Sequence, residues 1–152
     1  MEETFQAKIF RSGKRRFDCQ IEGEDGTVEA IAPGQILKAS HPVVGDNAII
    51  KKAVSGDSYE IVEIRPRENE IFRRIVRENK KKVIASNLDV LFIVMAVSKP
   101  DYKAGLVDRY LLRAMEWDIP AVLIFNKMDQ FDGQFDIEYE KLKYEKLLNL
   151  QT

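Results

Sequence analysis

The chain contains few of the residues that build covalently stabilised or metal-stabilised folds. Its 152 residues include one cysteine, Cys19, and one histidine, His41. A single cysteine excludes an internal disulfide framework. A structural zinc site needs four ligands, so these two residues cannot form one within this chain. We therefore expect Cys19 to lie in the core of a strand and His41 to occupy a turn before Pro42.

Long apolar segments are also missing. The longest uninterrupted apolar run covers residues 90–97, whereas a helix that crosses a bilayer needs about 20 apolar residues. The amino terminus, MEETFQAK, is acidic and has no apolar stretch that could serve as a signal peptide. Together with the scarcity of cysteine, these absences predict a cytoplasmic protein that does not contact a membrane.

A glycine-rich phosphate loop is the third absence. Such a loop follows the pattern G-x-x-x-x-G-K-[S/T], and Gly13-Lys14 is the one Gly-Lys pair of the chain. This pair does not fit, because Lys8 stands at the first glycine position and Arg15 at the Ser/Thr position. The sequence contains no G-x-G-x-x-G pattern either.

The charge is unevenly distributed, although the net charge is only -1. Residues 65–82 carry 8 Lys and Arg against 3 Asp and Glu, whereas residues 1–64 and 83–152 are each mildly acidic. A basic segment between two acidic blocks points to an anionic partner. A solvated basic linker explains the same pattern, and charge alone does not separate the two interpretations.

Residues 1–66 have the pattern of a small all-β domain. Short segments with partial apolar alternation, separated by turn residues, occur at 4–10, 15–23, 27–32, 46–54 and 58–64. About five short strands separated by turn signals predict a barrel or a sandwich. A five-stranded β-barrel of the oligonucleotide-binding (OB) fold fits this length.

The pattern then changes to that of an α/β domain. Residues 88–97 are nearly all apolar, which is typical of a strand buried on both faces of a parallel sheet. A second buried strand follows at 121–125, and residues 138–150 predict a further helix. The helix expected between the strands, at 106–117, places on one face Val107, Tyr110, Leu111, Ala114 and Met115. Strand, helix and strand predict one right-handed βαβ unit. Two strands are marginal alone, so we expect residues 83–152 to be the first part of a larger, truncated α/β domain.

The second strand runs into Asn126-Lys127-Met128-Asp129. Ligands of open α/β sheets bind at the carboxyl ends of the strands. Guanine presents a ring N–H and an exocyclic amine on one edge, and a carboxylate can accept both in a charge-assisted geometry. Asp129 would select the base, Lys127 would lay its aliphatic stem over the base plane, and Asn126 would bond the base and neighbouring loops. A polar turn after a strand is the alternative interpretation.

Five segments carry a resemblance to a known family: VVGD (43–46), RPRENEIFRR (65–74), VIASNLDVLFIV (83–94), LVDRYL (106–111) and FNKMD (125–129). The order of parts carries it too, because a barrel precedes the Asn-Lys-x-Asp motif and no phosphate loop lies upstream. The chain resembles the circularly permuted GTPases of the ribosome small-subunit-dependent GTPase A family, over nearly its whole length. In that family the guanine-reading half of the P-loop-type GTPase domain precedes the phosphate-binding half. Ser86 departs from the family, which more often has alanine there.

The resemblance implies a protein that hydrolyses GTP to GDP, is stimulated by the small ribosomal subunit and acts late in the maturation of that subunit. It implies that the barrel binds ribosomal RNA and that Asn126, Lys127 and Asp129 bind the nucleotide. It also implies that the phosphate loop, the Mg²⁺-binding switch elements and a small zinc-binding domain lie outside these residues. We therefore expect this chain to contain no catalytic or metal-ligating residues and to be inactive by itself. We also expect the protein to be a monomer.

With RNA as the implied partner, two groups of basic residues become candidates for binding it. Lys and Arg on phosphates give salt-dependent and largely sequence-independent affinity, and OB barrels bind nucleic acid through their loops. The group around the first barrel loop comprises Arg11, Lys14, Arg15 and Arg16. The group after the barrel comprises Arg65, Arg67, Arg73, Arg74, Arg77 and residues 80–82. Phe10, Phe17 and Phe72 could stack on bases, although we expect Phe10 and Phe17 to be core residues.

The leading hypothesis divides the chain into an OB barrel (1–66), a basic linker (67–82) and the first part of a permuted GTPase domain (83–152). The alternative is a complete, non-enzymatic RNA-binding protein with a vestigial α/β appendage. A third possibility, an unrelated α/β protein with a chance tetrapeptide, predicts no binding to small subunits. A phosphate-loop motif encoded within roughly 60 residues after Thr152 would favour the first hypothesis, and a stop codon the second.

Overall fold

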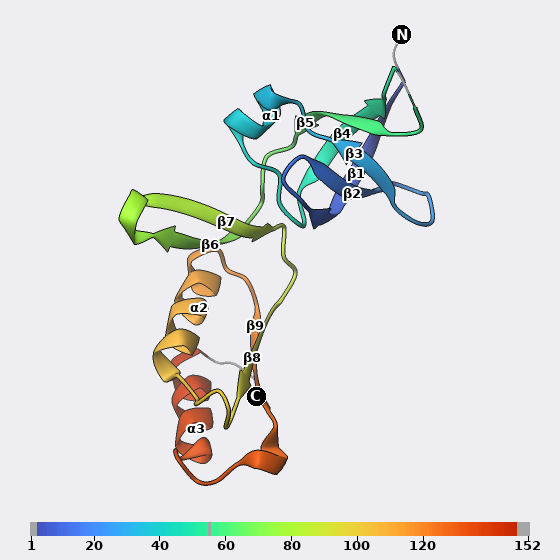
Figure 1. Cartoon of the computed structure of the whole chain (residues 1–152). Coiled ribbons are helices and arrows are strands. Elements are labelled where there is room, and N and C mark those ends of the chain that lie inside the picture. The colour runs from blue at the N-terminus through green and yellow to red at the C-terminus, as the bar shows by residue number, and fades with distance from the viewer. Residues whose placement is uncertain (1–2, 55, 149–152) are drawn as a thin grey trace. The chain divides into compact units, whose positions relative to one another are not determined.

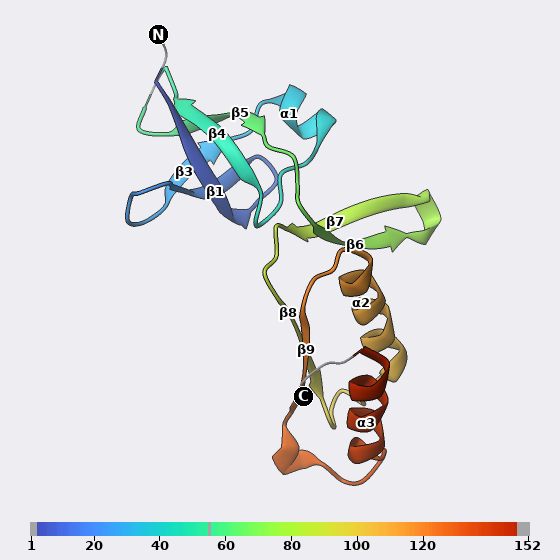
Figure 2. The ribbon, with the colours of Figure 1, turned by 180° about the vertical axis from the view of Figure 1, so that it is seen from behind.

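The computed structural model describes residues 3–54 and 56–148 of the chain (Figure 1). The chain divides into two compact units, Met1–Leu88 and Asp89–Thr152. Figure 2 shows the same ribbon from behind. In the part of the chain that the structure describes, no helix is long and apolar enough to cross a membrane.

The first unit contains a closed five-stranded barrel with the strand order β1-β2-β3-β5-β4. Its strands are β1 (Thr4–Ser12), β2 (Arg16–Ile21), β3 (Val28–Ile31), β4 (Asn47–Lys52) and β5 (Tyr59–Ile64). All neighbouring strands are antiparallel except β3 and β5, which run parallel. A short helix, α1 (Gly34–Ala39), lies between β3 and β4. The five-stranded, OB-like barrel expected from the sequence is therefore confirmed, with α1 as an element that the sequence analysis did not foresee.

The barrel core follows from apolar alternation along its strands. Ile9, Phe17, Cys19 and Ile61 are each at most 1% exposed. Phe17 and Cys19 are thus core residues as expected, and burial raises the pKa of the Cys19 thiol to about 11. The same expectation is wrong for Phe10, whose side chain is 52% exposed. The pairing of β1 with β2 shifts next to Phe10, and such a bulge redirects a side chain out of the regular alternation.

A β-hairpin follows the barrel within the same unit. Strand β6 (Glu70–Ile75) pairs antiparallel with β7 (Lys80–Ser86), and a 3₁₀ turn at Val76–Glu78 joins them. The expectation of a linker at 67–82 is therefore wrong, because these residues include most of a paired hairpin. The expectation that the second domain begins at residue 83 is also wrong. The hairpin belongs to the first unit, which extends to Leu88.

The charge of the hairpin explains why its strands were missed. Arg73 lies opposite Lys82, and Arg74 lies opposite Lys81. All four side chains are exposed, so the outer half of the hairpin lacks the apolar alternation that identifies a strand in a sequence. Like charges directly opposite one another also disfavour pairing. The inner half, where Ile71 and Phe72 are buried, holds the hairpin in place.

The loop that carries the VVGD motif lies against β7. Gly45 has φ +91°, and a Cβ atom added there would collide with the backbone carbonyl of Ser86. The Ser86 amide donates a hydrogen bond to the Val44 carbonyl at 3.0 Å. Glycine is therefore required both for its backbone conformation and for the close approach of the two segments.

A buried ionic network joins this loop to the hairpin. The Asp46 side chain is 0% exposed and that of Arg67 is 14% exposed. Arg67 donates to Asp46 from Nε at 2.7 Å and from its second terminal nitrogen at 2.9 Å, and Ser86 Oγ donates to Asp46 at 2.6 Å. Arg67 also pairs with Glu70 at 3.2 Å, and Lys81 pairs with Glu70 from the other strand.

This network determines the ionisation of Asp46. Burial by itself raises the pKa of the carboxyl, because a charge is costly away from water. Hydrogen bonds from Arg67, Ser86 and the Val43 amide, together with the Arg67 charge, outweigh burial and hold the pKa of Asp46 below its ordinary value. Asp46 is therefore an ionised anchor between the barrel and the hairpin.

The second unit is built on two parallel strands, β8 (Leu91–Ala96) and β9 (Ala121–Asn126). Helix α2 (Ala104–Glu116) connects them, and α3 (Ile137–Leu148) follows β9. The strand, helix, strand and helix expected from the sequence are thus present. Residues 149–150 of the last expected helix lie outside the described residues.

The two faces of this sheet differ, which corrects the expectation of strands buried on both sides. Ile93 and Leu123 are paired in register and are each 5% exposed. Phe92 and Val94 point to the opposite face and are 58% and 55% exposed. Both ribbon views place α2 and α3 on one side of the sheet (Figures 1 and 2). Helices in the described residues therefore cover one face only.

Helix α2 buries a narrower face than expected, and one of its side chains forms a hydrogen bond with α3. Val107, Leu111 and Ala114 are buried, whereas Met115 is 57% exposed and does not belong to that face. Asp108 accepts a hydrogen bond from the Tyr144 hydroxyl at 2.7 Å. This bond, which outweighs desolvation, and Lys143 beside it lower the pKa of the Asp108 carboxyl. The LVDRYL motif thus contributes the contact that positions α3.

Candidate functional site

The Asn-Lys-x-Asp motif lies where β9 ends, at the edge of the sheet where parallel-sheet ligands bind. Asn126 is the last residue of β9, and Lys127 adopts the left-handed conformation, with φ 60° and ψ 41°. A single 3₁₀ turn, η2 (Met128–Gln130), follows. The Val97 amide, just after β8, donates to the Asn126 carbonyl at 3.1 Å. The two parallel strands therefore end together at the motif.

Two internal contacts hold the first half of the motif. The Asn126 Oδ1 atom accepts a hydrogen bond from the Lys127 amide at 2.8 Å. The Lys127 ammonium donates to the backbone carbonyl of Lys99, in the loop after β8, at 2.8 Å. This second bond holds the ammonium at the neighbouring loop, so that the aliphatic stem of Lys127 spans the space between the two loops.

Asp129 differs from its neighbours because its carboxylate is open. The residue is exposed, and its side chain makes no hydrogen bond or ion pair with any other described residue. An unpaired carboxylate beside an anchored lysine can accept two N–H groups from a planar ring. The geometry of the motif therefore suits recognition of a guanine edge.

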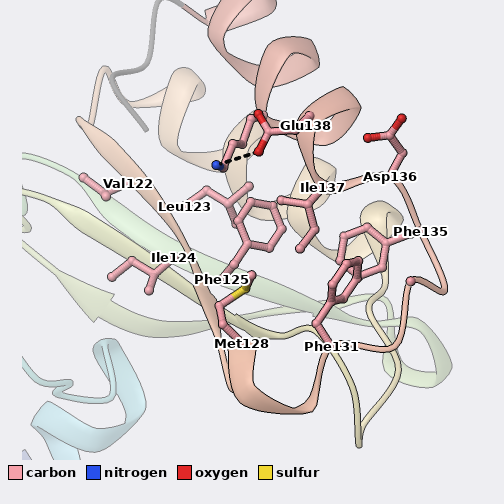
Figure 3. A pocket seen from close by; sticks show the side chains of 12 residues that line it. Val122, Leu123, Ile124, Phe125, Met128, Phe131, Phe135, Asp136, Ile137 and Glu138 are labelled. Carbon is pink, nitrogen blue, oxygen red and sulfur yellow. Dashed lines mark hydrogen bonds and ion pairs between the residues drawn. The ribbon is translucent and has the colours of Figure 1, made fainter.

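A hollow of about 740 Å³ lies beside the motif, between β9, η2 and the start of α3 (Figure 3). Its lining is mostly apolar and includes Leu123, Phe125, Phe131 and Ile137. Its charged residues are Asp136, Glu138 and Lys141. Two carboxylates against one ammonium do not suit a phosphate, so this hollow is not the missing phosphate cradle.

The first group of basic residues gathers around the turn between β1 and β2, as expected. Arg11, Lys14, Arg15 and Arg16 are all exposed. Arg11 has a long contact with Asp18 at 3.5 Å, and Arg16 pairs with Glu29 at 2.8 Å. The side chains of Lys14 and Arg15 have no partner among the described residues. All four remain accessible to an anionic ligand.

The second group is divided by the structure. Arg73 and Arg74 project from the outer half of the hairpin and have no side-chain partner within the described chain. Arg65 is exposed and pairs with Glu63 at 3.2 Å. Arg67 instead belongs to the buried network with Asp46. Its charge is engaged by Asp46 and Glu70 within the protein, so Arg67 does not contribute to the exposed basic surface.

The remaining basic candidates also lie on the hairpin. Arg77 follows β6, and residues 80–82 begin β7; all are exposed. Lys80 pairs with Glu78 at 3.3 Å, and the Lys81 ammonium lies 4.2 Å from the centre of the buried Phe72 ring. Phe72 is therefore covered and not free to stack on a base.

The packing of four aromatic rings around the motif was not predicted from the sequence; the rings belong to Tyr102, Phe125, Phe131 and Phe135. They come from a strand end and two loops, so no periodic pattern marks them. Within the described residues, no group of three or more His, Cys, Asp or Glu side chains is arranged to hold a metal ion.

Comparisons with known proteins place these observations in a family. The sequence model of the family described as RsgA GTPase matches residues 64–150. The "Small ribosomal subunit biogenesis GTPase RsgA" of Christiangramia forsetii is 34% identical over 132 residues, which are 84% of this chain and 39% of that protein. The chain thus spans about two fifths of the length of this relative.

Solved structures agree with the fold. The structure of YloQ, described as a circularly permuted GTPase, superposes with a TM-score of 0.59 at 24% identity, over 95% of this chain and 47% of that one. YjeQ from Thermotoga maritima superposes with a TM-score of 0.63 at 18% identity, over 95% of this chain and 50% of that one. At these identities the likeness establishes the architecture, a barrel followed by a GTPase-type α/β unit.

Proposed function

Since the chain belongs to the RsgA GTPase family, we propose that it forms the guanine-reading and RNA-binding part of a cytoplasmic GTPase that matures the small ribosomal subunit. The observation that carries this proposal is the open Asp129 carboxylate beside the anchored Lys127, at the carboxyl end of a parallel strand. The proposal assigns nucleotide selection to Asn126, Lys127 and Asp129. Hydrolysis, and its stimulation by the subunit, require the rest of the protein.

The division of labour follows from what each group can do. Asp129 accepts the two N–H groups of guanine, and Lys127 covers the ring while its ammonium stays on the Lys99 carbonyl. Mg²⁺ supplies charge neutralisation at the phosphates of a GTPase. Following the family resemblance, which implies both Mg²⁺ and zinc, we assign these metals to parts of the full-length protein outside residues 1–152.

Residues 1–152 alone should not hydrolyse GTP. Phosphoryl transfer depends on a phosphate cradle and a bound metal, and no phosphate-loop pattern occurs in this sequence. Phosphate release by the purified chain should therefore equal that of a buffer blank. If phosphate is released and the Asp129→Ala variant releases it at the same rate, the activity comes from a contaminating enzyme. Release that Asp129→Ala abolishes would contradict the prediction.

The exposed basic groups support contact with ribosomal RNA. Four cations surround the β1–β2 turn, and Arg73, Arg74, Arg77 and Lys82 project from the hairpin, where Lys82 is paired in register with Arg73. Such cations, when they neutralise phosphates, release counterions and make affinity fall with salt. We propose that both groups contact the phosphate backbone and that base sequence contributes little.

Removing these cations should change the salt dependence of binding to small ribosomal subunits. The double variants Lys14→Ala/Arg15→Ala and Arg73→Ala/Arg74→Ala should each lower the slope of log affinity against log salt by roughly one to two. The slope is measured with purified subunits over a range of KCl concentrations.

The matched control for these variants is Lys38→Ala/Arg109→Ala. It removes the same charge from α1 and α2, outside both basic groups. Equal slopes for all three double variants would show that binding depends on net charge alone. Undetectable binding of the unmodified chain would contradict the RNA-binding proposal.

A further inference from the structure

One aromatic ring, that of Phe135, contacts three other rings around the guanine-reading loop (residues 126–130). The ring of Phe135 is stacked on Tyr102, with centroids 4.3 Å apart and an interplanar angle of 15°. It meets Phe131 edge-on at 5.4 Å and lies 6.2 Å from Phe125 at a tilt of 34°. Figure 3 shows Phe125, Phe131 and Phe135 converging beside the loop.

Two of the partners of Phe135 flank the guanine-reading loop, and the third lies in the neighbouring loop after β8. Phe125 directly precedes Asn126, and Phe131 directly follows the turn that contains Asp129. Tyr102 belongs to the loop after β8, the same loop whose Lys99 carbonyl holds the Lys127 ammonium. Phe135 therefore joins both ends of the reading loop to the loop that anchors its lysine.

The reading loop has little other packing. Asn126, Lys127, Met128 and Asp129 are all exposed, and the loop contains one 3₁₀ turn. Two hydrogen bonds from one carboxylate to one base edge require that the carboxylate be held in the plane of the ring. Groups that bind or react need support from neighbours whose own positions are fixed by packing. Here that support comes from the flanking aromatic rings, and Phe135 is the member that contacts all the others.

We propose that Phe135 is a positioning residue for guanine recognition, which fixes the orientation of Asp129 through Phe131 and that of Lys127 through Tyr102. This inference rests on the proposed reading of guanine by the motif. Phe135 lies outside the Asn-Lys-x-Asp motif and does not contact the base. Its effect is on discrimination between bases, because a misaligned carboxylate accepts one N–H group where an aligned one accepts two.

The test compares GDP with inosine diphosphate (IDP), which lacks only the exocyclic amine. Each nucleotide is titrated into the ¹⁵N-labelled chain, and binding is followed by NMR at the amides of residues 126–130, because a site that holds only the base binds weakly. The unmodified chain should prefer GDP by roughly tenfold, since one hydrogen bond to a charged group is lost with IDP. Phe135→Ala should reduce this preference to about twofold or less, and Phe135→Tyr should retain it.

The preference is a ratio, so it does not depend on the fraction of molecules that are folded. A variant that merely destabilised the unit would weaken GDP and IDP binding equally and leave the ratio near its original value. Tyr139→Ala is the matched control, because Tyr139 is an exposed aromatic of the same region, at 64% exposure, and makes no ring contact among the described residues. It should leave the ratio unchanged.

Two negative outcomes are distinguishable. If the unmodified chain binds both nucleotides with the same affinity or binds neither, the proposed reading of guanine fails, and the role of Phe135 fails with it. If the unmodified chain prefers GDP and Phe135→Ala keeps that preference, the motif reads guanine without the help of Phe135. The second outcome overturns this inference and leaves the proposed function intact.

Discussion

Asp129→Asn should lower the affinity of the full-length protein for GTP by at least about a hundredfold and raise its affinity for xanthosine triphosphate. In the proposed site the carboxylate accepts both N–H groups of the guanine edge, whereas an asparagine side chain offers one acceptor oxygen and points its own NH₂ group at the other guanine donor. Sites that pair a buried polar group with its ligand discriminate by about 10⁴ or more. Xanthine carries a carbonyl in place of the exocyclic amine, and the new amide can donate to that carbonyl.

Nucleotide competition on the full-length protein measures this exchange of preference. Asp132→Asn is the matched control, because it makes the same chemical change three residues further on. Asp132 is exposed, and both of its hydrogen bonds are local: one oxygen accepts the Gln134 backbone amide, and the other accepts the Gln134 side-chain amide, a contact that asparagine loses. An unchanged ratio of GTP to xanthosine triphosphate affinity in Asp129→Asn would show that Asp129 does not read the base.

Asp46→Ala should lower the free energy of unfolding of the first unit by about 3–5 kcal/mol. Removing one partner of a buried ion pair leaves the other charge unpaired away from water. Here Arg67 would lose two short hydrogen bonds and the Ser86 hydroxyl would lose its acceptor. The measurement is urea unfolding followed by the NMR signals of barrel residues, which separates the first unit from the second.

Glu29→Ala is the control for this prediction. This variant breaks the ion pair between Glu29 and Arg16. The Arg16 side chain is 71% exposed and the Glu29 side chain is 43% exposed, and exposed pairs contribute at most about 1 kcal/mol to stability. A loss in Asp46→Ala no larger than that in Glu29→Ala would contradict a structural role for the network.

The same network makes a prediction about pH. The folded pKa of Asp46 lies below its ordinary value, which is about 3.9 in an unfolded chain. The network therefore stabilises the folded state fully at pH values above the unfolded pKa. Its contribution is lost as the pH falls through the folded pKa. The difference in stability between the unmodified chain and Asp46→Asn should shrink in that acidic range and stay constant between pH 6 and 8.

The reading loop was predictable from the sequence because its signals are local. An apolar run that ends in Asn126-Lys127-Met128-Asp129 predicts a strand followed by polar ligands, and the structure places β9 and its loop there. The barrel was predictable for a similar reason, since turn residues separate short alternating segments. In both cases the chain neighbours of a residue already determine its environment.

The hairpin was not predictable in the same way. Arg73 and Arg74 pair with Lys81 and Lys82 in spite of like charge, because the inner half of the hairpin is buried and held by Asp46 and Arg67, which are 21 residues apart. The open face of β8 was missed for the converse reason. Phe92 and Val94 are apolar, but their burial depends on what covers the sheet and not on the residues themselves.

By itself, the sequence determined the two kinds of architecture, their order along the chain and the position of the Asn-Lys-x-Asp motif after a strand, because each depends on local periodicity or on a contiguous motif. Only the tertiary structure decided which charged side chains form ion pairs inside the protein and which remain exposed to solvent. Arg67 and Arg73 are arginines of the same basic segment, yet one is enclosed with Asp46 and the other is open to solvent. It also brought Tyr102 and Phe135 together behind the motif, because contacts between distant loops leave no periodic trace in the chain.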